Sequence, residues 1–157
     1  MGFTVVIAAI NSIKVAETIG MGDQARMFSI VSLSALAMFV VLVTLAIVNI
    51  ANPEAHKRFM LIATVSLLQA AVARVFRAVL APTSVGRPQV AISIPPGLVA
   101  DLLLVALAVY DWRTRGKVHP VTMWAGGAVV LLQVVRLPLS ATPVWMAIAR
   151  AVEALAG

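Results

Sequence analysis

Four side chains that could bind a metal or a haem lie at the ends of apolar segments of the sequence. Glu54 and His56 precede one segment, Asp111 closes the next, and His119 precedes the one after that. Two imidazoles with one or two carboxylates would suit zinc, iron or manganese. His56 and His119, the chain's two histidines, could instead hold one b-type haem between two helices. No spacing matches a local metal motif, so either site requires the fold to bring the histidines together.

A second group of charges lies inside or beside the apolar segments. Arg74 and Arg136 each follow the start of an apolar segment by 15 residues, which is about 22 Å along a helix. Asp101 enters from the opposite side and reaches a similar depth. Lys14 and Glu17 also reach it if the first segment runs outward, as the segments of Arg74 and Arg136 do. An unpaired charge at this depth costs on the order of several kcal/mol. We therefore expect Asp101 to pair with Arg74 or Arg136.

Two explanations fit this intramembrane charge cluster. It could line a polar cavity that opens outward and admits a small anion, or form a proton path through Asp101. Alternatively it is a structural ion-pair layer whose arginines extend to the outer lipid headgroups. A position near an interface rather than at the bilayer centre favours the structural explanation. Gln69 lies deeper, and we expect it to form a hydrogen bond between helices.

The composition places these residues in a membrane protein. The chain has 157 residues, of which 62% are hydrophobic and 11% charged, and its mean hydropathy is +1.03. Soluble domains carry roughly 25% charged residues. The chain has no cysteine, which excludes disulfides and thiolate chemistry. The net charge of +6 comes from bases at the ends of apolar segments, so it indicates lipid headgroups and topology rather than nucleic acid.

The apolar segments predict one membrane domain over residues 1–157. The fold class is an all-α polytopic membrane bundle with four full or nearly full spans, because about 20 apolar helical residues cross the hydrocarbon core. A partial N-terminal helix precedes them, and a short amphipathic C-terminal helix at the membrane interface follows them. The expected segments are 3–18 (partial), 28–50, 59–80, 97–111, 121–137 and 143–156 (interfacial). The proline-rich stretch 81–96 is predicted to be a loop.

Basic residues in the short turns predict the orientation. The turns 51–58 and 112–120 are rich in lysine and arginine, whereas 19–27 and 81–96 offer only Arg26 and Arg87. We expect the two basic turns to be cytoplasmic.

Two motifs resemble those of a family of uncharacterised bacterial multi-spanning inner-membrane proteins. The patterns are P-[DE]-x-H-K-R-x-M and Y-D-x-R-x-x-G-x-V-H-P, and the resemblance covers roughly residues 28–150. The matching positions are Pro53, Glu54, His56, Lys57, Arg58 and Met60, then Tyr110, Asp111, Arg113, Gly116, Val118, His119 and Pro120. The resemblance implies a helical bundle and no established activity. Longer members carry further apolar helix upstream with a histidine-arginine motif, so this chain is expected to begin part-way along that region.

No sequence pattern assigns a catalytic residue, since neither a G-x-S-x-G elbow nor a phosphate loop occurs. The favoured function is a non-catalytic accessory subunit or scaffold of a larger membrane complex, or a self-associating bundle. One alternative is a membrane redox protein that binds b-type haem or a divalent metal through His56 and His119. Another is a small-solute or proton carrier centred on Asp101 and Arg74.

Overall fold

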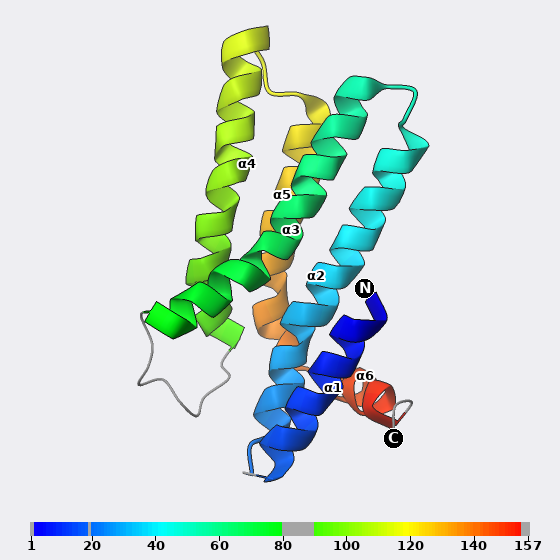
Figure 1. Cartoon of the computed structure of the whole chain (residues 1–157), viewed down its shortest axis with the longest axis vertical. Helices are drawn as coiled ribbons and strands as arrows, with labels where there is room; N and C mark the ends of the chain where they lie inside the picture. The colour runs from blue at the N-terminus through cyan, green and yellow to red at the C-terminus, as the bar shows by residue number, and fades with distance from the viewer. Residues whose placement is uncertain (1, 19, 80–89, 155–157) are drawn as a thin grey trace.

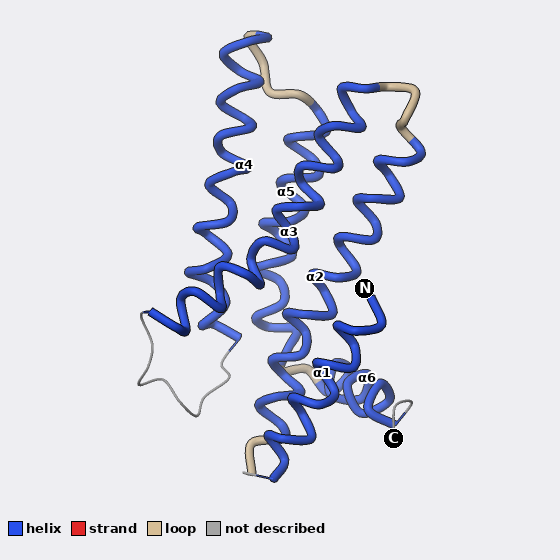
Figure 2. The backbone as a smooth tube through the Cα atoms, in the orientation of Figure 1, coloured by secondary structure: helices blue, strands red, loops and turns tan. Residues whose placement is uncertain are grey.

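The computed structural model describes residues 2–18, 20–79 and 90–154. Within these ranges the backbone is helical apart from short turns, and it contains no strand (Figure 2). The helices follow in the order α1 (Gly2–Thr18), α2 (Gly22–Val48), α3 (Pro53–Val79), the short 3-10 helix η1 (Val90–Ser93), α4 (Ile94–Arg115), α5 (Pro120–Ser140) and α6 (Pro143–Ala154). The predicted all-α helical bundle is therefore confirmed.

Four of the described helices, α2 to α5, are long and apolar enough to cross a membrane. They carry the four segments that the sequence predicted as spans. Their outward faces hold many exposed large apolar side chains, for example Val40, Ile47, Leu102 and Leu131. Water solvates such a surface poorly, whereas lipid tails cover it readily. These features are those of a multi-pass membrane protein.

Helix α3 begins earlier than predicted, at Pro53 instead of residue 59. Proline suits the first turn of a helix because its missing N–H has no intrahelical partner there. The side-chain oxygen of Asn52 accepts a hydrogen bond from the Ala55 N–H (3.3 Å), as a capping residue does. His56 therefore lies in the first turns of α3 and not in a loop.

Helix α4 is also longer than predicted at both ends. It begins at Ile94, so Pro95 and Pro96 lie in its first turn, where they are tolerated. It continues to Arg115 and is closed by Gly116, whose φ of +70° is left-handed. Only residues 116–119 of the predicted turn 112–120 are therefore non-helical. Of the predicted loop 81–96, residues 81–89 lie outside the described residues, and the remainder is helical.

Helix α5 extends past the predicted end at residue 137 to Ser140, with Pro138 inside its last turn. Helix α6 then begins at Pro143, as expected, and is described as far as Ala154. It packs against α2 and α5. The indole Nε1 of Trp145 donates to the carbonyl oxygen of Arg26 (3.0 Å), and Glu153 pairs with the same arginine.

The helices are arranged so that the two basic turns share one end of the bundle. Figure 1 shows the α2–α3 and α4–α5 turns together at the top, with the α1–α2 connection at the bottom and α6 in the lower half. Helix α3 is central and packs against α2, α4 and α5. Helix α1 lies along the N-terminal half of α2 (Figure 1). The apolar core between α2, α3, α4 and α5 comprises Leu42, Ile62, Ala63, Val65, Ala100, Leu104, Ala125 and Val129.

Candidate functional site

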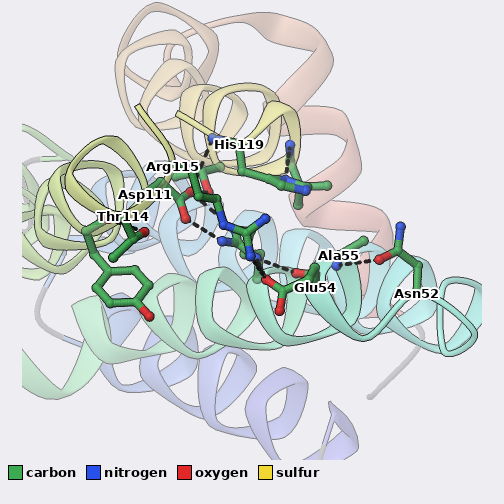
Figure 3. A network of polar contacts seen from close by, with 11 residues as sticks. Asn52, Glu54, Ala55, Asp111, Thr114, Arg115 and His119 are labelled. Carbon is green, nitrogen blue, oxygen red and sulfur yellow. Dashed lines mark hydrogen bonds and ion pairs between the residues drawn. The ribbon is translucent and has the colours of Figure 1, made fainter. Parts of the chain in front are cut away.

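One buried polar cluster, here called the Arg58 network, lies between α3, α4 and the start of α5. It comprises the buried residues Arg58, Asp111 and Thr122, the partly buried Glu54 and His119, and the exposed Arg115. Figure 3 shows the side chains of Glu54, Asp111 and Arg115 close together. Asp111 is 0% exposed and Arg58 4% exposed. Two nitrogens of Arg58 bond to the two carboxylate oxygens of Asp111. This bidentate geometry is the strongest form of the arginine–carboxylate pair.

The remaining acceptors of the Arg58 network are also filled. Thr122 Oγ1 donates to Asp111 Oδ2 (2.7 Å), and the backbone N–H of His119 donates to the same oxygen (3.3 Å). Glu54 accepts from Arg58 Nη1 (2.6 Å) and from Arg115. Charges removed from water are stable only when they are paired and hydrogen-bonded in this way. The network therefore joins the ends of three helices.

The two histidines make hydrogen bonds that fix different protonated nitrogens. His56 Nδ1 lies 2.8 Å from the carbonyl oxygen of Ala46, which can only accept, so this nitrogen carries a proton. His119 Nδ1 accepts from the backbone N–H of Val121 (3.1 Å) at the start of α5, so its proton lies on Nε2. Burial, followed by the positive charge of Arg58, lowers the pKa of His119 below its usual value.

The contacts of Glu54, Asp111 and His119 do not favour the predicted metal and haem sites, which stay predictions, whereas the contact of His56 leaves its Nε2 unprotonated. The part of the chain that the structure describes contains no group of three His, Asp or Glu residues that could hold a metal ion. The carboxylates are instead neutralised by arginine. For haem, an iron ligand needs an unprotonated nitrogen, and His119 uses that nitrogen to cap α5. The structure brings Glu54, Asp111 and His119 together around Arg58, which the sequence did not single out, whereas His56 bonds elsewhere.

A second buried polar cluster lies one level away on the same helices. From Arg58 to Gln69 on α3, from Asp111 to Asp101 on α4, and from Thr122 to Gln133 on α5, the spacing is ten or eleven residues. That is about 15 to 17 Å along the helices. The second cluster, here called the Arg136 layer, comprises Gln69, Ser93, Asp101, Gln133 and Arg136. The apolar core fills the space between the two clusters.

Within the Arg136 layer, two glutamines connect the charged side chains to their surroundings. Gln133 Nε2 lies 2.9 Å from both carboxylate oxygens of Asp101. Gln69 Nε2 donates to the carbonyl oxygen of Ser93 (3.1 Å), and its Oε1 accepts from Arg136 Nη1 (3.3 Å). Gly97 permits this arrangement, because a Cβ at that position would lie 2.5 Å from Gln133 Oε1 and 2.8 Å from Gln69 Nε2.

Arg136 is the incompletely bonded member of the layer. It is 2% exposed, and its Nε and Nη2 are buried without a hydrogen-bond partner. It borders a small cavity between α2, α3 and α5 that is also lined by Ser34, Ala35, Met38, Ser66, Gln69, Val129, Leu132 and Gln133. About 10 Å³ of this cavity is open to the centre of a water-sized particle, which is roughly the room that one water needs.

The predicted five-residue charge cluster is only partly assembled. Asp101 and Arg136 lie in the same layer, but these two described residues form no direct ion pair, and Gln133 supplies the hydrogen bonds to the carboxylate. Arg74 is exposed, because it lies five residues beyond buried Gln69 and thus about 140° around the helix. Lys14 is exposed too, and Glu17 pairs with Arg26. Counting residues along each helix predicted how deep these charges lie but not the side of the helix from which they project.

Two central residues were missed in the sequence, Arg58 as a buried ion and Gln133 as a partner of Asp101. A signal for both exists in the helical periodicity. Buried residues recur every three or four positions along α3 and α5, and the polar ones fall in phase with the apolar ones. On α3 this stripe is Arg58, Ile62, Val65, Ser66 and Gln69, and on α5 it is Thr122, Ala125, Gly126, Val129, Gln133, Arg136 and Ser140.

Comparisons with known protein families, with curated proteins and with solved structures give no match to this chain. The motif-based family resemblance therefore stays a prediction. The site must be interpreted from its own geometry.

Proposed function

We propose that this multi-pass membrane protein binds a small polar solute in the Arg136 layer. The observation that carries the proposal is the pair of buried, unpartnered nitrogens on Arg136 beside a cavity. An unsatisfied buried donor costs about 1–3 kcal/mol, and more when the group is charged. A bound solute that accepts these hydrogen bonds would remove this penalty. The predicted carrier function thus centres on Asp101 and Arg136 in place of Asp101 and Arg74.

The apolar core supports a binding site rather than an open channel. Ile62 is 0% exposed and Leu42 2% exposed, and with Leu104 and Val129 they separate the two polar clusters. A polar solute crossing this apolar region would lose its hydration without gaining partners. The arrangement therefore favours occupation of the Arg136 layer from its own end of the bundle, and passage would need the helices to rearrange.

The accessory-subunit and redox functions stay predictions. The exposed apolar helix faces that a partner subunit would cover can equally be covered by lipid, and no contact in the described chain selects a partner. For the redox function, His119 is committed to the start of α5. The Arg136 layer is the feature with unused binding capacity.

Thermal unfolding of the purified protein in detergent, followed by tryptophan fluorescence, tests the proposal. The protein is heated in formate, chloride or formamide, with gluconate as a solute too large for the cavity. A ligand that binds only the folded state stabilises it by about 2.7 kcal/mol at 100 times its Kd. We expect at least one small solute to raise the unfolding midpoint of the wild type and of Arg74→Gln, but not of Arg136→Gln.

Arg74→Gln is a matched control because it removes an exposed arginine from the same bundle. If no small solute shifts the wild-type midpoint, or if the shift survives Arg136→Gln, the Arg136 layer is not a solute site.

We also propose a bacterial inner-membrane location with the Arg58 network at the cytoplasmic side. Support comes from the basic residues Arg113, Arg115 and Lys117 at that end. The chain has no cysteine, so single cysteines report topology directly. In intact cells a membrane-impermeant maleimide should label Ala141→Cys and spare Lys117→Cys, and the reverse pattern would invert the orientation.

A further inference from the structure

The buried side-chain atoms of the cavity that lack a hydrogen-bond partner among the described residues are both donors. Nε and Nη2 of Arg136 can only donate. The amide nitrogens of Gln69 and Gln133 are already committed to Ser93 and Asp101. The hydroxyls of Ser34 and Ser66 donate to backbone carbonyls within their own helices and can rotate toward an occupant. An occupant must therefore accept hydrogen bonds next to a guanidinium, which favours an anion over a neutral amide or a cation.

The layer also contains the group that balances the charge of such an anion. Arg136 and an ionised Asp101 already sum to zero, so a monovalent anion would leave a net charge of −1 in a buried layer. Among the described side chains, Arg136 is the charged group that faces Asp101. The side chains that the structure describes on α3 and η1 contribute the neutral groups of Gln69 and Ser93 to this layer. A proton on Asp101 restores neutrality when the anion enters.

The contact between Asp101 and Gln133 can accommodate this proton. Gln133 Nε2 lies 2.9 Å from each carboxylate oxygen, so protonation of one oxygen leaves the other as its acceptor. Asp101 is 7% exposed, and no carboxylate other than Asp101 lies in the described part of this layer. Protonation therefore changes the charge of the layer without removing the hydrogen bond that orients it.

We propose that the Arg136 layer binds a small monovalent anion together with one proton, the anion on Nε and Nη2 of Arg136 and the proton on a carboxylate oxygen of Asp101. The inference rests on the proposed solute site and deepens it by naming the ligand class and its coupling. The complete step adds one anion and one proton and forms or breaks no covalent bond other than the O–H bond. Binding is therefore electroneutral. Because the cavity has roughly the room of one water, the smallest anions, such as chloride and formate, are the appropriate probes.

Anion affinity as a function of pH provides the first test. Chloride and formate affinities are derived from the unfolding midpoint of the detergent-purified protein between about pH 5 and about pH 8. Formamide, which is neutral and of nearly the same size as formate, is the matched ligand control. Once Asp101 is ionised in the free protein, one coupled proton weakens anion binding by about tenfold for each unit of pH. Formamide should give no such dependence.

Asp101→Asn separates the coupling from the binding. This variant mimics the protonated side chain, so formate should bind with the low-pH affinity at every pH. Mixing formate with weakly buffered wild-type protein near the upper end of this range should raise the pH of the solution, because the protein takes up one proton per bound anion. Asp101→Asn should take up none.

The outcomes distinguish the two proposals. Formate binding that needs Arg136 but is independent of pH in the wild type, without proton uptake, would overturn the coupling and leave the solute site intact. Stabilisation by formamide alone would overturn the anion assignment. Absence of any solute effect in the wild type would overturn both. The wild-type pH series needs no substitution, so the test holds even if Asp101→Asn does not fold.

Discussion

The substitution Asp111→Ala tests whether the Arg58 network holds three helices together. It leaves Arg58, which is 4% exposed, as a buried arginine without its bidentate partner. Removing one member of a buried ion pair typically destabilises a protein by about 3–5 kcal/mol. Thr122 also loses the acceptor of its 2.7 Å hydrogen bond, which adds about 1 kcal/mol. We expect the free energy of unfolding to fall by about 4–6 kcal/mol.

Reversible unfolding by SDS in mixed micelles, followed by tryptophan fluorescence, measures this loss. Thr122→Val is the matched control, because it removes one hydrogen bond to the same carboxylate and should cost only about 1 kcal/mol. The double variant Arg58→Met with Asp111→Leu should recover most of the lost stability, since apolar side chains of similar volume often replace a buried ion pair without loss. If Asp111→Ala costs no more than Thr122→Val, the network does not stabilise the bundle as argued.

The remaining predictions concern a close contact and a pH dependence. Gly97→Ala should lower stability and weaken formate binding, because its methyl group would displace the amides of Gln69 and Gln133. The control Gly127→Ala has nothing within 4 Å of the new Cβ. It should be neutral or stabilising by up to about 1 kcal/mol. The pKa of His119 is lowered in the folded protein. As the pH falls below about 6.5, His119 is therefore protonated in the unfolded chain before it is protonated in the folded one. Stability conferred by neutral His119 is therefore present at higher pH and lost on acidification. His119→Asn keeps a capping side chain but does not titrate, so its unfolding midpoint should fall less than that of the wild type between about pH 8 and about pH 5; equal falls would contradict the assignment.

The sequence predicted the spans well because hydropathy alone determines them. The uncharged segment 28–50 lies almost wholly within α2 (Gly22–Val48), and each of the three later spans lies on the expected helix. Two of the boundary errors are at helix starts that contain proline. Pro53 was placed in a turn, and Pro95 and Pro96 in a loop, but each lies in the first turn of a helix, where a missing N–H has no consequence.

The candidate site was harder to predict because depth along a helix is only one of two coordinates. Residue counting put Asp101 and Arg136 at one level, and they do lie near each other. The same counting included Arg74, whose rotation about α3 exposes it. The side of the helix on which a residue lies follows from the stripe of buried residues along α3. On this stripe Arg58 is in phase with Ile62 and Gln69, which becomes visible once the helix is extended back to Pro53. In the sequence, Arg58 counted as one of the basic residues that predict the orientation. The packing of the helices shows that it is buried.

The most direct measurement is anomalous diffraction from crystals of the protein grown in bromide near pH 5. Bromide has the charge of chloride and only a slightly larger radius. Its anomalous scattering distinguishes it from water and from the atoms of the protein. The account predicts an anomalous peak between α2, α3 and α5, within hydrogen-bonding distance of Nε and Nη2 of Arg136. A cavity that contains only water at saturating bromide, or Arg136 nitrogens bonded to protein groups instead, would contradict it.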